Sequence, residues 1–167
     1  MHQHISQTHR ICAIAPTARG FGFAVMEAEN SLIAFGSKRV RGNKNEKSMN
    51  AITKLFDYYR PEVVVLPDVT EKDVRRATRI KVLHRLITEL ANSRKLEATK
   101  VSGKRLRAGL LGGPRGTKHQ MAGAVAAQFP NELASLLPSK RRAWEGENAN
   151  MDMFDAMGLL VAFCKRQ

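Results

Sequence analysis

The stretch that decides the fold lies near the start of the chain and reads ICAIAPTARGFGFAVMEAENSLIAFGSKRV, residues 11–40. Its first apolar run covers residues 11–14 and is broken by Pro16, whereas the segment after Gly20 alternates in the manner of a strand. A turn at Glu29-Asn30 leads into a third strand-like segment. Three consecutive strands with such short connections predict an antiparallel meander.

Beyond this meander the pattern changes to helices alternating with strands. Apolar residues recur at helical spacing from Met49 to Phe56, and Pro61 ends that helix. The continuous β-branched run VVVL at 63–66 is typical of a buried parallel strand. The order predicts an α/β fold with a mixed five-stranded sheet, three antiparallel strands followed by βαβ crossovers, flanked by helices. We expect further helices at about 71–93, 103–111, 117–129 and 151–163, a strand at 96–101, an irregular stretch at 130–150, and one domain at 10–167 behind a flexible tail at 1–9.

Charge is the most informative total of the composition. The chain has 167 residues, of which 28 are Lys or Arg and 15 are Asp or Glu, for a net charge of +13. Such an excess attracts polyanions, so we expect a nucleic-acid partner. No apolar run approaches the roughly 20 residues of a spanning helix, and the N-terminus lacks an apolar signal core, so we expect a cytoplasmic protein with no membrane partner.

Cysteine and histidine give no metal or disulfide framework. Cys12 and Cys164 are the two cysteines, and we expect both to be packing residues in a reducing compartment. His2, His4 and His9 form no metal-ligand spacing with any cysteine. No small-molecule cofactor is expected.

Three separated segments carry candidate chemistry. The first is Ile14-Ala-Pro-Thr17 followed by Gly20-Phe-Gly-Phe23. The second is Arg107-Ala-Gly-Leu-Leu-Gly112 followed by Lys118-His-Gln-Met121, and the third is Asp152-Met-Phe-Asp-Ala156. Together, in this order and at these separations, they resemble the RuvC-type Holliday-junction resolvases of the RNase H-like superfamily. In that family the segments correspond to the opening strand and turn, a basic stretch, and paired acids at the start of the last helix.

The resemblance implies an RNase H-like fold and a structure-selective endonuclease that acts on branched DNA in recombination or repair. Carboxylates there hold two Mg²⁺ or Mn²⁺ ions about 4 Å apart, and the matching residues here are Asp152, Asp155 and Asp68. Lys118 would lie near the scissile phosphate, and His119 would act as a general acid or hold a water. A homodimer is implied, because a four-way junction offers two symmetric strands. Acids in a first helical turn are also ordinary partners of the helix dipole.

Two positions depart from the family pattern. Ala15 stands where the family has its first catalytic Asp, and Pro67 stands where it has a Glu at the end of the fourth strand. The neighbouring Asp68 could replace that Glu only if Pro67 ends the strand and turns the chain, since adjacent strand residues face opposite ways. We therefore expect impaired hydrolysis. Ala15 is either a natural divergence or an introduced inactivating change, and Pro67 favours divergence.

Basic side chains outside this set are candidates for binding nucleic acid. No aromatic residues are interleaved with them in the way that stacks single-stranded bases, which favours recognition of backbone and shape. The bend GGPRGTK at 112–118 fails the P-loop pattern. The expected contact residues are Arg75, Arg76, Arg79, Lys104, Arg105, Arg107 and Arg115.

Three functions stay open at this point. The first is a RuvC-like endonuclease that is impaired as the chain stands. The second is a catalytically inactive nucleic-acid-binding or scaffolding protein on the same fold, which Ala15 and Pro67 favour. The third is an RNA-associated member of the superfamily.

Overall fold

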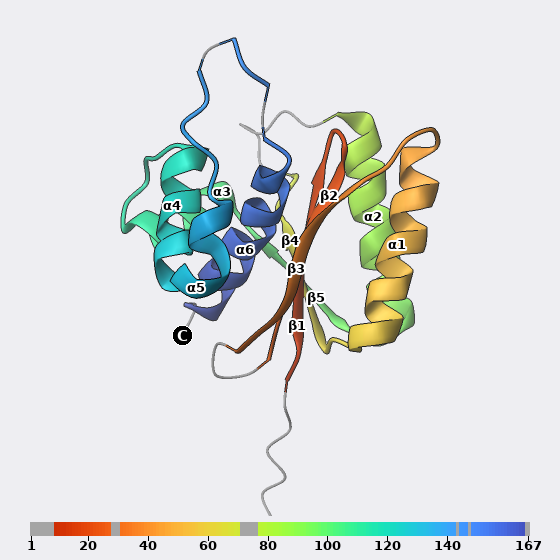
Figure 1. Cartoon of the computed structure of the whole chain (residues 1–167). Helices are drawn as coiled ribbons and strands as arrows, with labels where there is room; N and C mark the ends of the chain where they lie inside the picture. The colour runs from red at the N-terminus through yellow and green to blue at the C-terminus, as the bar shows by residue number, and fades with distance from the viewer. Residues whose placement is uncertain (1–8, 28–30, 71–76, 143, 147, 166–167) are drawn as a thin grey trace, which may run out of the picture.

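The computed structural model describes residues 9–27, 31–70, 77–142, 144–146 and 148–165, so the turn predicted at 29–30 and most of the tail predicted at 1–9 lie outside it. Its centre is a five-stranded sheet in the order β3-β2-β1-β4-β5 (Figure 1). Strands β1 to β3 pair antiparallel, and β1, β4 and β5 pair parallel. The predicted mixed sheet is therefore confirmed. The strands are β1 (Ile11–Thr17), β2 (Gly20–Glu27), β3 (Ser31–Arg39), β4 (Val63–Pro67) and β5 (Glu97–Val101).

Pro16 does not break the first strand, contrary to the prediction. It pairs with Phe21 of β2 inside the β1–β2 ladder. On its other side β1 pairs with β4 only over Ile11, Cys12 and Ala13. At Pro16 the strand therefore has one neighbour, and the missing proline N–H falls where no ladder hydrogen bond is required.

Helices cover both faces of the sheet (Figure 1). The prediction of a helix at 71–93 is confirmed from Thr78 onward, and residues 71–76 lie outside the described part. The irregular stretch predicted at 130–150 is wrong at its start, where Pro130 occupies the first turn of a short helix, a position that proline favours. One face carries α1 (Lys44–Tyr59) and α2 (Thr78–Ser93), and the other carries α6 (Asn150–Cys164), backed by α3 (Gly103–Leu111), α4 (Lys118–Gln128), α5 (Pro130–Leu133) and the turn η2 (Ala134–Leu136).

The sheet separates two apolar cores, because successive residues of a strand point to opposite faces. Ala13 and Ala15 of β1 pack toward α6, whereas Cys12 and Ile14 pack toward α1 and α2. Complete burial raises the pKa of the Cys12 thiol to about 12, so Cys12 stays protonated and packs as an apolar group. Burial also raises the pKa of the half-buried Cys164.

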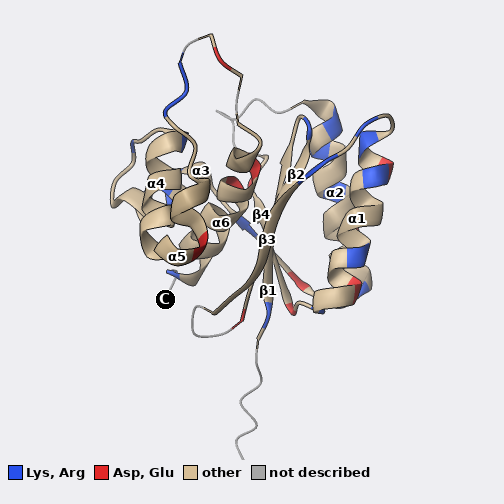
Figure 2. Ribbon diagram, viewed as in Figure 1, with Lys and Arg blue, Asp and Glu red and all other residues tan. Residues whose placement is uncertain are grey.

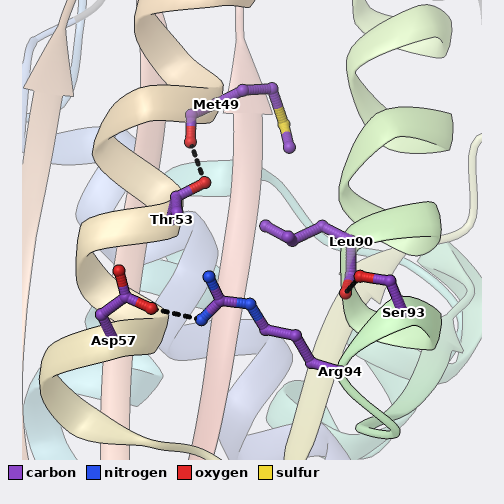
Figure 3. A network of polar contacts seen from close by, with 6 residues as sticks. All are labelled: Met49, Thr53, Asp57, Leu90, Ser93 and Arg94. Carbon is purple, nitrogen blue, oxygen red and sulfur yellow. Dashed lines mark hydrogen bonds and ion pairs between the residues drawn. The ribbon is translucent and has the colours of Figure 1, made fainter.

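The two helices of one layer are joined by a polar contact as well as by the core. Arg94, the residue that ends α2, forms an ion pair with Asp57 of α1 (Figure 3). Within α1, the Thr53 hydroxyl donates to the Met49 carbonyl at 2.7 Å. The ion pair joins the C-terminal ends of the two helices, and Arg10, just before β1, donates to the carbonyl of Tyr59 at the end of α1, so this contact lies near the start of β1. In the described part of the chain, no helix has the length and apolar character needed to cross a bilayer.

Candidate nucleic-acid site

A row of small residues lets the last helix approach the sheet. Ala15 of β1 pairs with Gly22 of β2, which in turn pairs with Ser37 of β3. A Cβ atom built on Gly22 would lie 1.7 Å from the carbonyl oxygen of Asp152. The backbone of the first turn of α6 therefore lies directly on Gly22, and only glycine fits there.

Ser37 attaches the start of α6 to the edge strand. Its hydroxyl accepts a hydrogen bond from the Met153 N–H at 3.0 Å and donates to the Ala149 carbonyl at 2.9 Å. Ala149 is the N-terminal cap and has no side-chain oxygen of its own. A hydroxyl from β3 thus bridges the Met153 N–H and the Ala149 carbonyl, the two groups that form the first i to i−4 hydrogen bond of a regular helix.

Asp152 lies in this first turn and is 7% exposed. Its Oδ2 accepts a hydrogen bond of 3.0 Å from the Thr17 hydroxyl at the end of β1. Thr17 and Ala15 are two residues apart in the strand, so both face α6. The structure thus places Asp152 beside the opening strand, as expected, although nothing in the sequence indicated Thr17 as the donor.

Asp155 lies one helical turn further on and meets the start of α4. Its Oδ2 is 3.6 Å from Nζ of Lys118, in a pair that is partly open to solvent. His119, predicted to act as a general acid or to hold a water, lies next to Lys118 and contacts the chain after α5. Its Nε2 lies 3.1 Å from the Pro138 carbonyl oxygen, so that nitrogen holds the chain that follows α5.

Asp68 does not join the acids of α6. Val65 packs in the α6 core and Leu66 in the opposite core, and the Asp68 N–H extends the pairing with β5 by donating to the Val101 carbonyl at 2.9 Å. The same alternation turns Asp68 toward α2, away from Asp152. Its pKa is lowered, first by hydrogen bonds from the Thr70 hydroxyl and N–H and further by the charges of Lys100 and His84.

The donor set therefore does not fit two divalent ions. Ala15 and Pro67, which face α6 at the positions of the family acids, carry no ligand atom. Among the residues that the structure describes, no three Asp, Glu, His or Cys side chains gather as a metal site would require. Asp152 and Asp155 are instead contacted by a hydroxyl and an ammonium group.

Lys and Arg residues occur at the starts of α1 and α2, near the end of β1 (Figure 2). Arg79 at the start of α2 donates to the Thr17 carbonyl at 2.8 Å and to Asn45 Oδ1 at 3.1 Å. Lys44 donates to the Ala18 carbonyl at 2.8 Å. Arg79 was predicted to bind nucleic acid, and the structure shows it also joining β1, α1 and α2.

The other predicted contact residues differ in exposure. Lys104 and Arg115 are exposed, and Arg107 donates from Nε to the Pro114 carbonyl at 2.8 Å. The Nη2 atom of Arg105 is buried and makes no hydrogen bond with the described residues. The predicted contacts at 75 and 76 lie outside the described part of the chain.

A pocket of about 620 Å³ opens beside Lys118. Its walls are the start of α4, the segment between α5 and α6, and the start of α6, and the described residues in them carry more basic than acidic side chains. The lining residues are Thr117, Lys118, His119, Pro138, Ser139, Lys140, Arg141, Glu145, Gly146, Asn148 and Met151.

Solved structures of other proteins have the same arrangement of strands and helices. Thermus thermophilus RuvC superposes with a TM-score of 0.67 at 12% identity, and the same protein in complex with a Holliday junction substrate with 0.69 at 13%; each match covers 93% of both chains. The yeast mitochondrial Holliday junction resolvase Ydc2 gives 0.64 at 13% identity, over 93% of this chain and 78% of that one. The chain has the RuvC fold. No family model and no curated protein matches the sequence.

The RuvC fold explains why three distant segments of the sequence meet. β1 delivers Ala15 and Thr17, α4 delivers Lys118, and α6 delivers Asp152 and Asp155 to one end of the sheet. Two side-chain contacts link these segments directly: Thr17 with Asp152, and Lys118 with Asp155. The first-strand acid that the resemblance implies is missing from this meeting point.

Proposed function

We propose that this protein recognises branched DNA by the shape and the phosphate charge of the DNA, and that the protein's own site for phosphodiester hydrolysis is impaired. The observation that carries the proposal is the methyl group of Ala15 facing the acidic turn of α6 within a RuvC fold. The fold is that of a protein solved with a Holliday junction, whereas the position for the first metal ligand holds a group that cannot coordinate an ion.

Charge supports the binding half of the proposal. The net charge is +13, and Lys44 and Arg79 lie against the end of β1. Lys140 and Arg141 line the pocket together with Lys118, the partner of Asp155. A DNA backbone that crossed this end of the molecule would pass over cations from both layers and release counterions from its phosphates.

Symmetry of the substrate supports a dimer. A four-way junction presents two equivalent strands, so two copies of the chain, each offering one site, match it. Light scattering of the free protein and of its junction complex would give the number of copies bound.

A second candidate, metal-dependent cleavage, is favoured by one observation. Asp152 and Asp155 lie on one side of α6 with Lys118 beside them, the arrangement that would leave a weak site for one ion and one phosphate. Phosphoryl transfer depends on concentrated positive charge, so any activity from two acids would be far below that of a complete set.

Equilibrium binding tests the proposal. We expect fluorescence anisotropy to give at least tenfold tighter binding to a four-way junction than to a linear duplex of the same sequence, with both affinities falling as salt rises. Lys140→Gln should weaken junction binding and reduce the slope of log affinity against log salt by about one. Lys54→Gln, which removes another exposed charge from the middle of α1, is the matched control and should change neither. Equal affinities for junction and duplex would overturn the proposal.

A further inference from the structure

The segment between α5 and α6, residues 137–149, forms a loop that rises above the α4–α6 layer (Figure 1). Positions 143 and 147 within it lie outside the described residues. Its base is held at two points: His119 Nε2 is 3.1 Å from the Pro138 carbonyl oxygen, and the Asn150 side-chain amide donates to the Leu136 carbonyl at 3.1 Å. We call this segment the α5–α6 loop.

The α5–α6 loop forms one wall of the 620 Å³ pocket, a volume within the range of about 300–1,000 Å³ that small ligands occupy. Three of its lining residues are basic: Lys118, Lys140 and Arg141. Among the described lining residues, Glu145 is the one acid. Glu145 already lies 3.7 Å from Arg142, outside the pocket. The described lining therefore keeps an excess of positive charge, which suits a phosphate.

In the sequence Trp144 lies between the lining residues Arg141 and Glu145; it is not itself a lining residue of the pocket, and it is 78% exposed. The guanidinium of Arg142 lies over its ring, 5.6 Å from the ring centre. An indole with most of its surface in water gains little for folding, whereas a ring beside several cations offers a stacking surface for a nucleobase. Arg19, in the turn between β1 and β2, comes within 3.9 Å of where a Cβ on Gly146 would lie, so the loop also adjoins the end of β1.

We propose that the α5–α6 loop binds one unpaired nucleotide of a branched DNA, with its phosphates in the pocket facing Lys140, Arg141 and Lys118 and its base stacked on the exposed ring of Trp144 at the edge of that pocket. The inference rests on the proposed function, since it concerns the DNA that the protein would bind. It adds a contact to a base, in a protein whose other contacts are to backbone. Stacking needs no particular base, so the pocket would select unpaired nucleotides rather than a sequence.

Trp144 is the one tryptophan of the chain, so intrinsic fluorescence reports on it directly. The test compares two four-way junctions that differ at one position next to the branch point, which holds either an unpaired adenosine or an abasic residue. We expect the junction with the unpaired base to quench the fluorescence strongly and to bind about tenfold more tightly than the abasic junction. Trp144→Ala should remove that tenfold difference, and Trp144→Phe should keep most of it.

Tyr58→Ala is the matched control, because Tyr58 is also 78% exposed but lies on α1, in the layer on the other face of the sheet. It should leave the difference between the two junctions unchanged. If Trp144→Ala and the parent bind both junctions alike while still preferring junctions to duplex, the inference fails and the proposed function stands. If neither junction binds better than duplex, the proposed function fails first. If deoxyadenosine monophosphate alone quenches the fluorescence at micromolar concentration, the pocket is a site for free nucleotides and the inference is wrong.

Discussion

Thr17 and Asp152, 135 residues apart in the sequence, are joined by a hydrogen bond of 3.0 Å between the threonine hydroxyl and Oδ2 of the aspartate. The bond connects the end of the central strand β1 to the first turn of α6. The carboxylate that accepts it is one of those that the sequence predicted as metal ligands. The contact therefore stabilises the fold at the place where the chemistry would occur.

Replacing Thr17 tests the strength of this contact. Thr17→Val keeps the branched shape but removes the donor from an aspartate that is 7% exposed. We expect the free energy of unfolding at pH 7 to fall by about 1–3 kcal/mol, the cost of a lost hydrogen bond to a buried charged group. Urea denaturation would measure it. The control is Thr53→Val, whose hydroxyl donates to a carbonyl within α1, and it should change stability by less than about 0.5 kcal/mol. Equal losses in the two variants would contradict this account of Thr17.

Gly22 is the position where the sheet and α6 are closest. Gly22→Ala would place a methyl group 1.7 Å from the Asp152 carbonyl oxygen, so backbone must move. We expect a loss of about 3 kcal/mol or more in thermal or urea unfolding. Gly123→Ala on α4 is the control, because its added Cβ meets nothing within 4 Å. That variant should be more stable than the parent by about 0.5–1 kcal/mol, since alanine favours a helix. A tolerated Gly22→Ala would show that α6 does not pack as described.

Ala15 and Pro67 together define what the site lacks. Ala15→Asp alone should destabilise the protein, because the new carboxylate would be buried beside Asp152, and the loss should be smaller at pH 4 than at pH 7 as the carboxyl takes up a proton. We expect no recovered cleavage, because Asp68 faces α2. Ala15→Asp with Pro67→Glu should restore a set that binds Mn²⁺, seen as a rise in melting temperature with added Mn²⁺.

The control for this pair is the same double variant carrying Asp155→Asn, which should lose the Mn²⁺-dependent rise. If Ala15→Asp by itself cleaves junctions, the remaining acids were sufficient. The impaired site would then be one substitution from activity.

His84 makes stability depend on pH. It is 4% exposed, its Nε2 lies 2.9 Å from the Pro67 carbonyl oxygen, and burial lowers its pKa below the ordinary value of 6.5. The unfolded chain therefore takes up a proton near pH 6.5 before the folded chain does, so stability is lost as the pH falls below 6.5. His84→Gln keeps an N–H for the Pro67 carbonyl and cannot titrate. We expect its unfolding free energy to fall less between pH 7 and pH 5 than that of the parent, and an identical fall would show that His84 is not the source.

Much of the fold follows from local pattern. The alternation after Gly20, the run at 63–66 and the helical spacing from Met49 identify elements whose faces must be buried, and the structure has all of them. The meeting of Asp152 with the opening strand was also predictable, because the resemblance supplied the order of the elements.

The rest depends on distances between layers, which no local pattern records. Thr17 as the donor to Asp152 follows from how closely α6 lies on Gly22, a property of the packed sheet. The direction of Asp68 follows from β4 continuing its pairing past Pro67. The basic run just before Trp144 is visible in the sequence, but the exposure of its ring and the pocket beside it become apparent only once the α5–α6 loop is placed.

The most direct test of the account is whether a four-way junction is bound and left intact. An end-labelled junction is incubated with excess protein and Mn²⁺, the complex is isolated on a native gel, and its strands are then separated on a denaturing gel. We predict a shifted complex, at protein concentrations that leave linear duplex unshifted, from which full-length strands are recovered. Nicks placed symmetrically about the branch point, or no shift at all, would contradict it.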